Sequence, residues 1–317
     1  VEINSGGKSM TRSVETFREI RFTARDGLRL YGRHYPASAA PRDGAIRRPL
    51  VCLAGLTRNS RDFHTIAEAL SRRSSAPRDV YTLDYRGRGL SDSDPEWRNY
   101  NVPFEAMDVL DFLTVTGLHG AAILGTSRGG IIAMVMAAMQ PKALGPVVLN
   151  DIGPVIDAKG LQRISAYVGR IPLPASWADA GLLVHDMGKR AFPNLPQEEC
   201  VEIARQWFNE HKGRPAPGYD PALSNALSVL DGPIPALWPQ FDALKRVPVL
   251  VLRGENSDIL AETTVTEMSR RHPALSSFTV PAQGHAPLLR DDETIGVAAE
   301  FLSATEANAW QPRLAYG

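Results

Sequence analysis

Long apolar runs, an excess of charge of one sign and cysteine are all scarce in this sequence, and each scarcity excludes a class of protein. Every apolar run falls short of the roughly 18 residues that a transmembrane helix needs. Basic and acidic residues balance at 35 each, which argues against a general binder of nucleic acid or of anionic membranes. The two cysteines, Cys52 and Cys200, lie far apart, and the apolar run around Cys52 is typical of a reduced thiol in a protein core.

Recognisable cofactor and targeting motifs are lacking as well. The sequence contains no C-x-x-C or H-E-x-x-H spacing and no Walker-type glycine loop, since residues 5–9 (SGGKS) have the wrong spacing and follow no strand. We therefore expect neither a metal nor a cofactor. Residues 1–9 lack the order of a secretory signal, so we expect an added leader or an upstream extension, a native start at Met10 and a cytoplasmic protein.

What the sequence does contain is a regular alternation of strand-like and helix-like segments. At 317 residues the chain is long enough for one large α/β domain or for two domains. Short apolar runs predict buried parallel strands, and runs with helical spacing lie between them. The alternation predicts a mostly parallel sheet with helices on both faces. The expected strands are residues 17–22, 28–35, 49–54, 80–85, 121–124, 146–150, 247–252 and 277–280, and the expected helices are 61–71, 104–115, 131–139 and 291–302.

The alternation stops between residues 152 and 246. This segment is rich in proline, has no run typical of a parallel strand, and has helical pieces at 160–168, 177–189 and 197–210. Because it lies between two core strands, we predict a core of residues 1–151 and 247–317 and an inserted helical cap of residues 152–246. Such a cap over the carboxyl ends of the strands would form much of a substrate pocket. Its tryptophans are therefore candidate substrate contacts, although a packing module without substrate contact is the alternative; they are Trp177, Trp207 and Trp238.

The most informative motif is Gly125-Thr126-Ser127-Arg128-Gly129, which stands between an expected strand and an expected helix. In that context G-x-S-x-G predicts a nucleophile elbow with Ser127 at its tip. Side chains two residues before or after the serine would collide with the neighbouring strand or helix, so both positions need glycine. Ser127 is the predicted nucleophile.

A serine hydroxyl needs a base that takes its proton and an acid that orients the base. Of the seven histidines, only His285 lies in the loop between the last expected strand and the last expected helix, so His285 is the predicted base. For the acid we favour Asp258, which follows the VPVLVLR strand. Glu255 in the same loop and Asp151 at the end of PVVLND are alternatives, and Asp151 is the stronger of the two.

The oxyanion formed during acyl transfer needs two backbone N–H donors. One candidate is the amide of Arg128, directly after the nucleophile. The other is the amide of Leu56, in the loop after the PLVCLA strand, where Gly55 allows a close approach of the backbone.

Five motifs occur along the chain in this order: AGLTRNS, DYRGRGLSD, GTSRGG, LRGENSD and GHAP. Together they resemble the motifs of the capped α/β-hydrolases, a group that includes esterases, lactonases, carbon–carbon bond hydrolases, haloperoxidases and epoxide hydrolases. The resemblance covers nearly all of residues 17–304 and implies an eight-stranded sheet with a cap inserted after the sixth strand. Family members often carry histidine where this chain has Ala54; the change removes a histidine contact but keeps the backbone donor. Ser127 replaces the aspartate of epoxide hydrolases and haloalkane dehalogenases and so excludes both reactions.

Arginines are frequent near the expected mouth of the pocket. Most of them suit surface or structural positions, but Arg58, just past the oxyanion loop, is a candidate for binding a substrate carboxylate. The full set is Arg58, Arg61, Arg86, Arg88, Arg98 and Arg128.

The function predicted from the sequence is a serine hydrolase that cleaves a carboxylic ester or lactone of a small molecule through an acyl-enzyme. One alternative is a carbon–carbon bond hydrolase of a ring-fission (vinylogous diketone) acid, whose charge would suit the arginines. Another is a non-catalytic receptor for a small molecule on the same fold. We expect a small-molecule substrate and neither nucleic acid nor membrane as partner, and the sequence leaves substrate identity and oligomeric state open.

Overall fold

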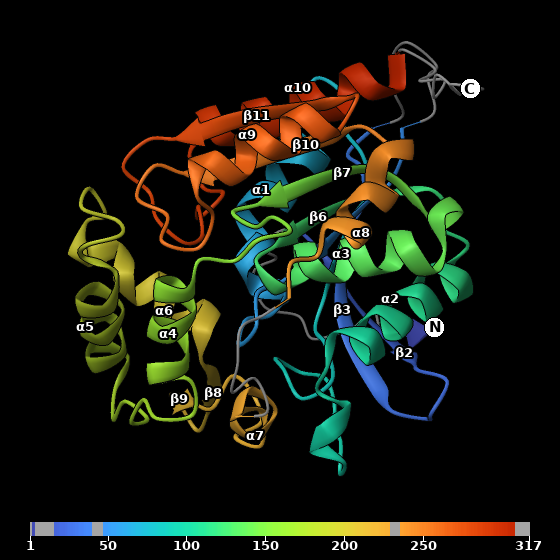
Figure 1. Ribbon diagram of the computed structural model, residues 1–317. Helices are drawn as coiled ribbons and strands as arrows, with labels where there is room; N and C mark the ends of the chain where they lie inside the picture. The colour runs from blue at the N-terminus through green and yellow to red at the C-terminus, as the bar shows by residue number, and fades with distance from the viewer. Residues whose placement is uncertain (1, 4–15, 40–46, 229–234, 308–317) are drawn as a thin grey trace.

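The computed structural model describes residues 2–3, 16–39, 47–228 and 235–307, and its centre is a nine-stranded sheet (Figure 1). The strand order is β1-β2-β3-β5-β4-β6-β7-β10-β11. From β5 to β11 neighbouring strands are parallel, and β1, β2 and β3 pair antiparallel. The predicted eight strands are thus confirmed, and β1 adds a ninth. The strands are β1 (Glu2–Ile3), β2 (Arg18–Thr23), β3 (Arg29–Tyr35), β4 (Leu50–Leu53), β5 (Val80–Leu83), β6 (Ala121–Thr126), β7 (Leu144–Asn150), β10 (Val249–Gly254) and β11 (Leu275–Val280).

The central strands are apolar because both faces of the sheet are covered. Every residue of β4 and of β7 is buried, as expected for parallel strands between two helix layers. Helices α2, α3 and α8 pack together against the sheet, and α10 packs with η2 and the strands β7 and β10. The helices outside residues 152–246 are α1 (His64–Glu68), α2 (Val102–Thr116), α3 (Arg128–Met139), α9 (Glu262–Arg271) and α10 (Asp292–Ala307), with shorter turns η1 (Ser60–Phe63), η2 (Ala69–Arg73), η3 (Trp97–Asn99) and η4 (Pro141–Ala143).

The predicted helix over residues 61–71 lies in a continuous helical stretch, in which the structure distinguishes three consecutive elements, η1, α1 and η2. At the amino-terminal end, the hairpin of β2 and β3 turns at Gly27, whose φ of +91° lies in the left-handed region that favours glycine. The expected leader over residues 1–9 falls outside the described residues, apart from the two of β1.

Residues 152–246, called here the inserted segment, leave the sheet after β7 and return to it at β10. Figure 1 shows α4, α5 and α6 beyond the carboxyl end of β7, with the β8–β9 hairpin beside them. Helices α5 and α6 form a small apolar core of their own around Val184 and Ile203. The elements are α4 (Ala158–Tyr167), α5 (Trp177–Gly188), η5 (Gln197–Glu199), α6 (Cys200–Trp207), β8 (Asn209–His211), β9 (Arg214–Ala216), α7 (Leu223–Ser228), α8 (Trp238–Asp242) and η6 (Ala243–Arg246).

The last part of the inserted segment belongs with the main core. Helix α8 packs against α3, and its Phe241 is fully buried in the main apolar cluster. The division into a core and a cap stays a prediction, and this packing places α8 on the core side of it. Both cysteines are buried free thiols, and none of the described helices has the length and apolar character to cross a membrane.

Candidate active site

Ser127 stands at a sharp turn between β6 and α3. Its backbone adopts φ 52° and ψ −115°, a strained conformation that exposes the side chain at the edge of the sheet. A Cβ on Gly125 would meet the backbone of Gly129, and a Cβ on Gly129 would meet the carbonyl oxygen of Leu53. The two glycines are therefore required sterically, for the reason inferred from the sequence.

His285 lies in the loop between β11 and α10 and faces Ser127. Its Nε2 is 2.9 Å from Ser127 Oγ, and its Nδ1 is 2.8 Å from Oδ2 of Asp151. The imidazole is almost completely buried, so these two contacts occupy both ring nitrogens away from bulk water. The structure thus brings the predicted nucleophile and the predicted base together.

The carboxylate at His285 belongs to Asp151 and not to Asp258, so the preferred sequence prediction is not supported. Asp151 directly follows β7, has a φ of 56° and is fully buried. Besides the imidazole it accepts hydrogen bonds from the Gly254 amide (2.8 Å) and from Ser257 Oγ (2.6 Å). These hydrogen bonds fix the orientation of the buried carboxylate toward the imidazole.

Asp258 lies in the expected loop but pairs elsewhere. Both of its oxygens accept from the guanidinium of Arg163 on α4, at 2.6 and 2.8 Å. The hydrogen bond from Arg163 lowers the pKa of Asp258, whose side chain is partly exposed. Because β7 and β10 are neighbouring strands, a carboxylate at the end of either one lies near the imidazole, and the sequence alone left both possible. The third candidate, Glu255, accepts from the amide of Ala282.

The residues of both predicted oxyanion donors lie close to Ser127. Arg128 is the first residue of α3, and Leu56 lines the cavity beside the serine. A Cβ built on Gly55 would lie 3.9 Å from Ser127 Cβ, which shows how closely the oxyanion loop approaches the elbow.

A cavity of about 320 Å³ opens at Ser127 and His285, between the strand ends and the inserted segment. Its walls are mainly apolar, with Phe192 and Leu195 contributed by the inserted segment and Leu288 by the loop that carries His285. The lining includes Trp207 and Arg58, two of the predicted substrate contacts. Arg58 binds both oxygens of Asp62 and stacks 4.3 Å from the Trp207 ring, so its charge is already paired.

Trp177 and Trp238, the other two predicted substrate contacts, do not line this cavity. Trp177 packs against the apolar core of α5 and α6, where its indole donates to the carbonyl of Gly213. Trp238 packs with Phe241 at the main core. The packing alternative therefore holds for both tryptophans.

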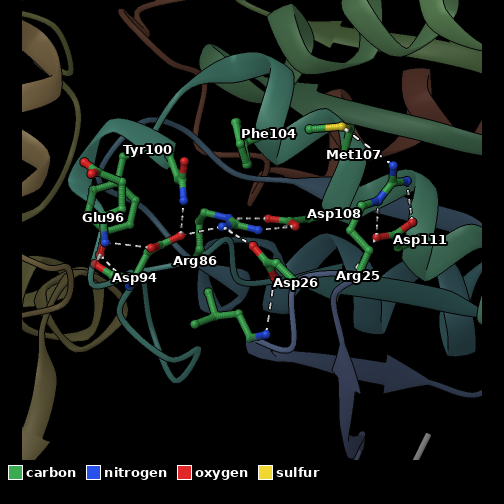
Figure 2. Close-up of polar contacts among 12 residues, drawn as sticks. Arg25, Asp26, Arg86, Asp94, Glu96, Tyr100, Phe104, Met107, Asp108 and Asp111 are labelled. Atoms are coloured by element: carbon green, nitrogen blue, oxygen red, sulfur yellow. Dashed lines mark hydrogen bonds and ion pairs between the residues drawn. The ribbon is translucent and has the colours of Figure 1, made fainter.

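Most of the arginines expected at the mouth are structural. Figure 2 shows Arg86 buried among three carboxylates, Asp26, Asp94 and Asp108. Arg61 donates to the carbonyls of Gln206 and Phe208 in the inserted segment. The others also pair with the protein: Arg88 and Arg128 bind Glu105, and the exposed Arg98 pairs with Glu96.

Several polar residues of the cavity were not singled out from the sequence, among them Arg163 and Tyr167. Both lie on α4, four residues apart and therefore on one face of that helix. The helical spacing of this segment is evident in the sequence, but nothing in it indicates which face of the helix turns toward the serine.

Within the described residues, no group of three His, Cys, Asp or Glu side chains is placed to hold a metal ion.

Comparison with known proteins assigns the family. The sequence model of the alpha/beta hydrolase family matches residues 50–297. The chain belongs to this family. This hydrolase is 33% identical to the 3-hydroxybutyrate-oligomer hydrolase of Cupriavidus necator, over 82% of this chain and 90% of that protein. It is 27% identical to the 2-(acetamidomethylene)succinate hydrolase of Mesorhizobium japonicum, over 73% of this chain and 79% of the relative.

A solved α/β-hydrolase from Novosphingobium aromaticivorans DSM 12444 has the same fold. It superposes with a TM-score of 0.82 at 33% identity, over 91% of this chain and 98% of that structure. The family resemblance inferred from the motifs is therefore confirmed.

Proposed function

We propose that this α/β-hydrolase is a serine hydrolase that cleaves a carboxylic ester or lactone of a small molecule through an acyl-enzyme intermediate. The observation that carries the proposal is the continuous hydrogen-bond chain from Ser127 through His285 to Asp151, beside a largely apolar cavity. Ser127 Oγ attacks the carbonyl carbon while His285 Nε2 takes its proton and later returns it to the leaving alcohol. Asp151 holds the imidazole in the required orientation and supports its positive charge.

The proposed oxyanion hole consists of the backbone amides of Leu56 and Arg128. Water then attacks the acyl-enzyme with His285 again as the base, which releases the acid and restores Ser127. The inserted segment supplies much of the cavity wall, and we assign it the role of a cap that excludes bulk water and selects the acyl group.

The substrate class that fits best is a short ester of a hydroxy acid with a free carboxylate. Two observations support it: the relative named for 3-hydroxybutyrate oligomers, and the presence of Arg58 and Arg163 in a cavity that is otherwise mostly apolar. Asp62 and Asp258 already pair with these arginines. A substrate carboxylate would therefore accept hydrogen bonds from the other edge of a guanidinium group, and it would not neutralise an unpaired positive charge.

A carbon–carbon bond hydrolase of a ring-fission acid is the second candidate, and the same two arginines are the observation in its favour. This reaction would use the same arrangement of Ser127 and His285. The two candidates must therefore be distinguished by comparing the turnover of their substrates.

The deciding experiment compares a 3-hydroxybutyrate dimer, its methyl ester, a simple lactone and a ring-fission acid as substrates. We expect ester cleavage to be fastest, with the free-acid dimer preferred over its methyl ester. Folded Ser127→Ala protein should lose at least about 1,000-fold in kcat. Preferential turnover of the ring-fission acid would establish the second candidate. Near-normal ester turnover by Ser127→Ala would rule out the proposed nucleophile, and failure of wild-type Ser127 to react with a fluorophosphonate would favour the non-catalytic receptor.

A further inference from the structure

A buried ion-pair bridge includes Arg128, whose backbone amide is one of the two proposed oxyanion donors. Glu105, in the first turn of α2, is fully buried between two guanidinium groups. Its Oε2 accepts from Arg128 Nε at 2.6 Å, and its Oε1 lies 2.7 Å from Nη2 of the equally buried Arg88. One carboxylate therefore joins the elbow residue Arg128 to the loop that follows β5.

That loop in turn holds the oxyanion loop, which follows β4 and carries Leu56. Arg88 Nε donates to the carbonyl oxygen of Leu56 at 3.0 Å, and the Tyr85 hydroxyl donates to the carbonyl oxygen of Ala54 at 3.1 Å. These two bonds fix the carbonyls immediately before and after the peptide that bears the Leu56 amide. The third carbonyl, that of Gly55, accepts from the amide of Arg58 at 3.1 Å.

We propose that Glu105 and Arg88 are positioning residues that link the two oxyanion donors, the amides of Leu56 and Arg128, into one rigid frame. The inference rests on the proposed acyl-transfer function. What is new is a bridge between the two donor residues, which runs from Arg128 through Glu105 and Arg88 to Leu56. The side chains of the bridge would not touch the substrate.

Stability alone is a weak reason for such a bridge, because the desolvation of buried charges offsets most of what their attraction contributes. Transition-state stabilisation, in contrast, depends on the exact spacing of the donors, and a displacement of about 1 Å costs roughly 100-fold in rate. The planar guanidinium of Arg88 contacts Glu105 and the carbonyl of Leu56 at the same time. Because its donors have a fixed geometry, it resists a displacement of one relative to the other.

The neighbouring cluster in Figure 2 offers a matched comparison. Asp108 lies one turn after Glu105 on α2, is also buried, and pairs with Arg86 of the same loop. Within the described residues, Asp108 makes no hydrogen bond or ion pair to Leu56, Arg88 or Arg128. The substitutions Glu105→Gln and Asp108→Asn each remove one buried charge from α2, and only the first breaks the bridge.

The test measures kcat, KM and the affinity of a trifluoromethyl ketone whose acyl group matches the best substrate. Ser127 Oγ adds to the ketone carbon, the serine proton passes to His285, and the carbonyl oxygen becomes an oxyanion in the hole. Affinity for this compound therefore reports on the donors without turnover. For Glu105→Gln we expect kcat and ketone affinity to fall together by roughly 10- to 100-fold with little change in KM. Asp108→Asn should keep both values within about threefold of wild type.

Arg128→Met is the second variant, since it keeps the backbone amide and leaves Glu105 paired with Arg88. It should show the same joint loss, and it keeps the test decisive if Glu105→Gln does not fold. Wild-type ketone affinity in a folded bridge variant would overturn the inference. So would equal losses in Glu105→Gln and Asp108→Asn at equal melting temperature. Failure of the proposed function gives a different result, namely ester turnover that survives Ser127→Ala.

Discussion

At the scale of single residues, the decisive feature is which carboxylate faces His285. Asp151 has three donors around it and no exposure to solvent, whereas Asp258 is partly exposed and paired with Arg163. The loop after β10 contributes to the site through Gly254 and Ser257, which donate to Asp151. The loop thus supports the acid instead of supplying it.

This geometry predicts losses of kcat of very different size for two similar substitutions. Asp151→Asn keeps the shape of the side chain but places an amide at the imidazole, which favours the wrong tautomer, so kcat should fall by roughly 10,000-fold. Asp258→Asn should lower kcat by less than about tenfold, because it breaks only the pair with Arg163. Both are measured on the same ester at the same pH. A larger loss in Asp258→Asn than in Asp151→Asn would contradict the assignment and restore the original sequence prediction.

At the scale of elements, the turn from β6 to α3 is fixed by sterics on its inner side. Gly129 packs against the backbone of β4, where a methyl group would meet the carbonyl of Leu53. Gly129→Ala should therefore lower the free energy of unfolding by at least about 2 kcal/mol, because neither backbone can withdraw. Chemical denaturation of the two proteins measures the difference.

The matched control is Gly296→Ala in α10, where a Cβ would meet open space. Alanine is favoured over glycine inside a helix, so this variant should be more stable by up to about 1 kcal/mol. Wild-type stability in Gly129→Ala would mean that the elbow is not as tightly packed as the structure shows.

How much of the structure the sequence predicts depends on whether a feature leaves a local pattern in the sequence. The parallel strands were found because burial on both faces makes them continuous apolar runs such as LVCL in β4, and the elbow was found because its glycines are sterically required. In the inserted segment, the helices predicted at 160–168, 177–189 and 197–210 correspond to α4, α5 and η5 with α6. The β8–β9 hairpin and the short helices α7 and α8 were not predicted, because they depend on tertiary contacts that leave weak local patterns. Trp177 and Trp238 carry the same chemistry as Trp207, and only packing decides which of them reaches the cavity.

At the scale of the whole molecule, polar contacts join the inserted segment to the core at two places beside the cavity. Arg61 and Asn59 bind the backbone carbonyl of Gln206, at the end of α6. Arg163 of the inserted segment binds Asp258 of the core. Arg61 and Arg163 thus both serve the contact between the inserted segment and the core.

Dependence of stability on pH is a property of the whole fold, and His272 gives one contribution a definite sign. Its Nδ1 accepts from the Ala274 amide, so its Nε2 carries the proton and donates to the carbonyl of Leu244. Burial lowers the pKa of His272, and Lys245 lowers it further, while the hydrogen bond to the Leu244 carbonyl and the charge of Asp242 oppose the shift. The unfolded chain therefore binds a proton at this histidine more readily than the folded chain does.

His272 thus contributes stability above its unfolded pKa of about 6.5, and that contribution is lost as the pH falls. Other groups titrate in the same range, so the prediction is a difference between proteins. Between about pH 7.5 and pH 5, His272→Gln should lose less unfolding free energy than wild type, since the amide keeps one donor and one acceptor without titrating. His119→Gln, at an exposed histidine, should follow the wild-type curve. Denaturant unfolding at several pH values measures all three, and parallel curves for His272→Gln and wild type would show that this histidine is not held neutral by the fold.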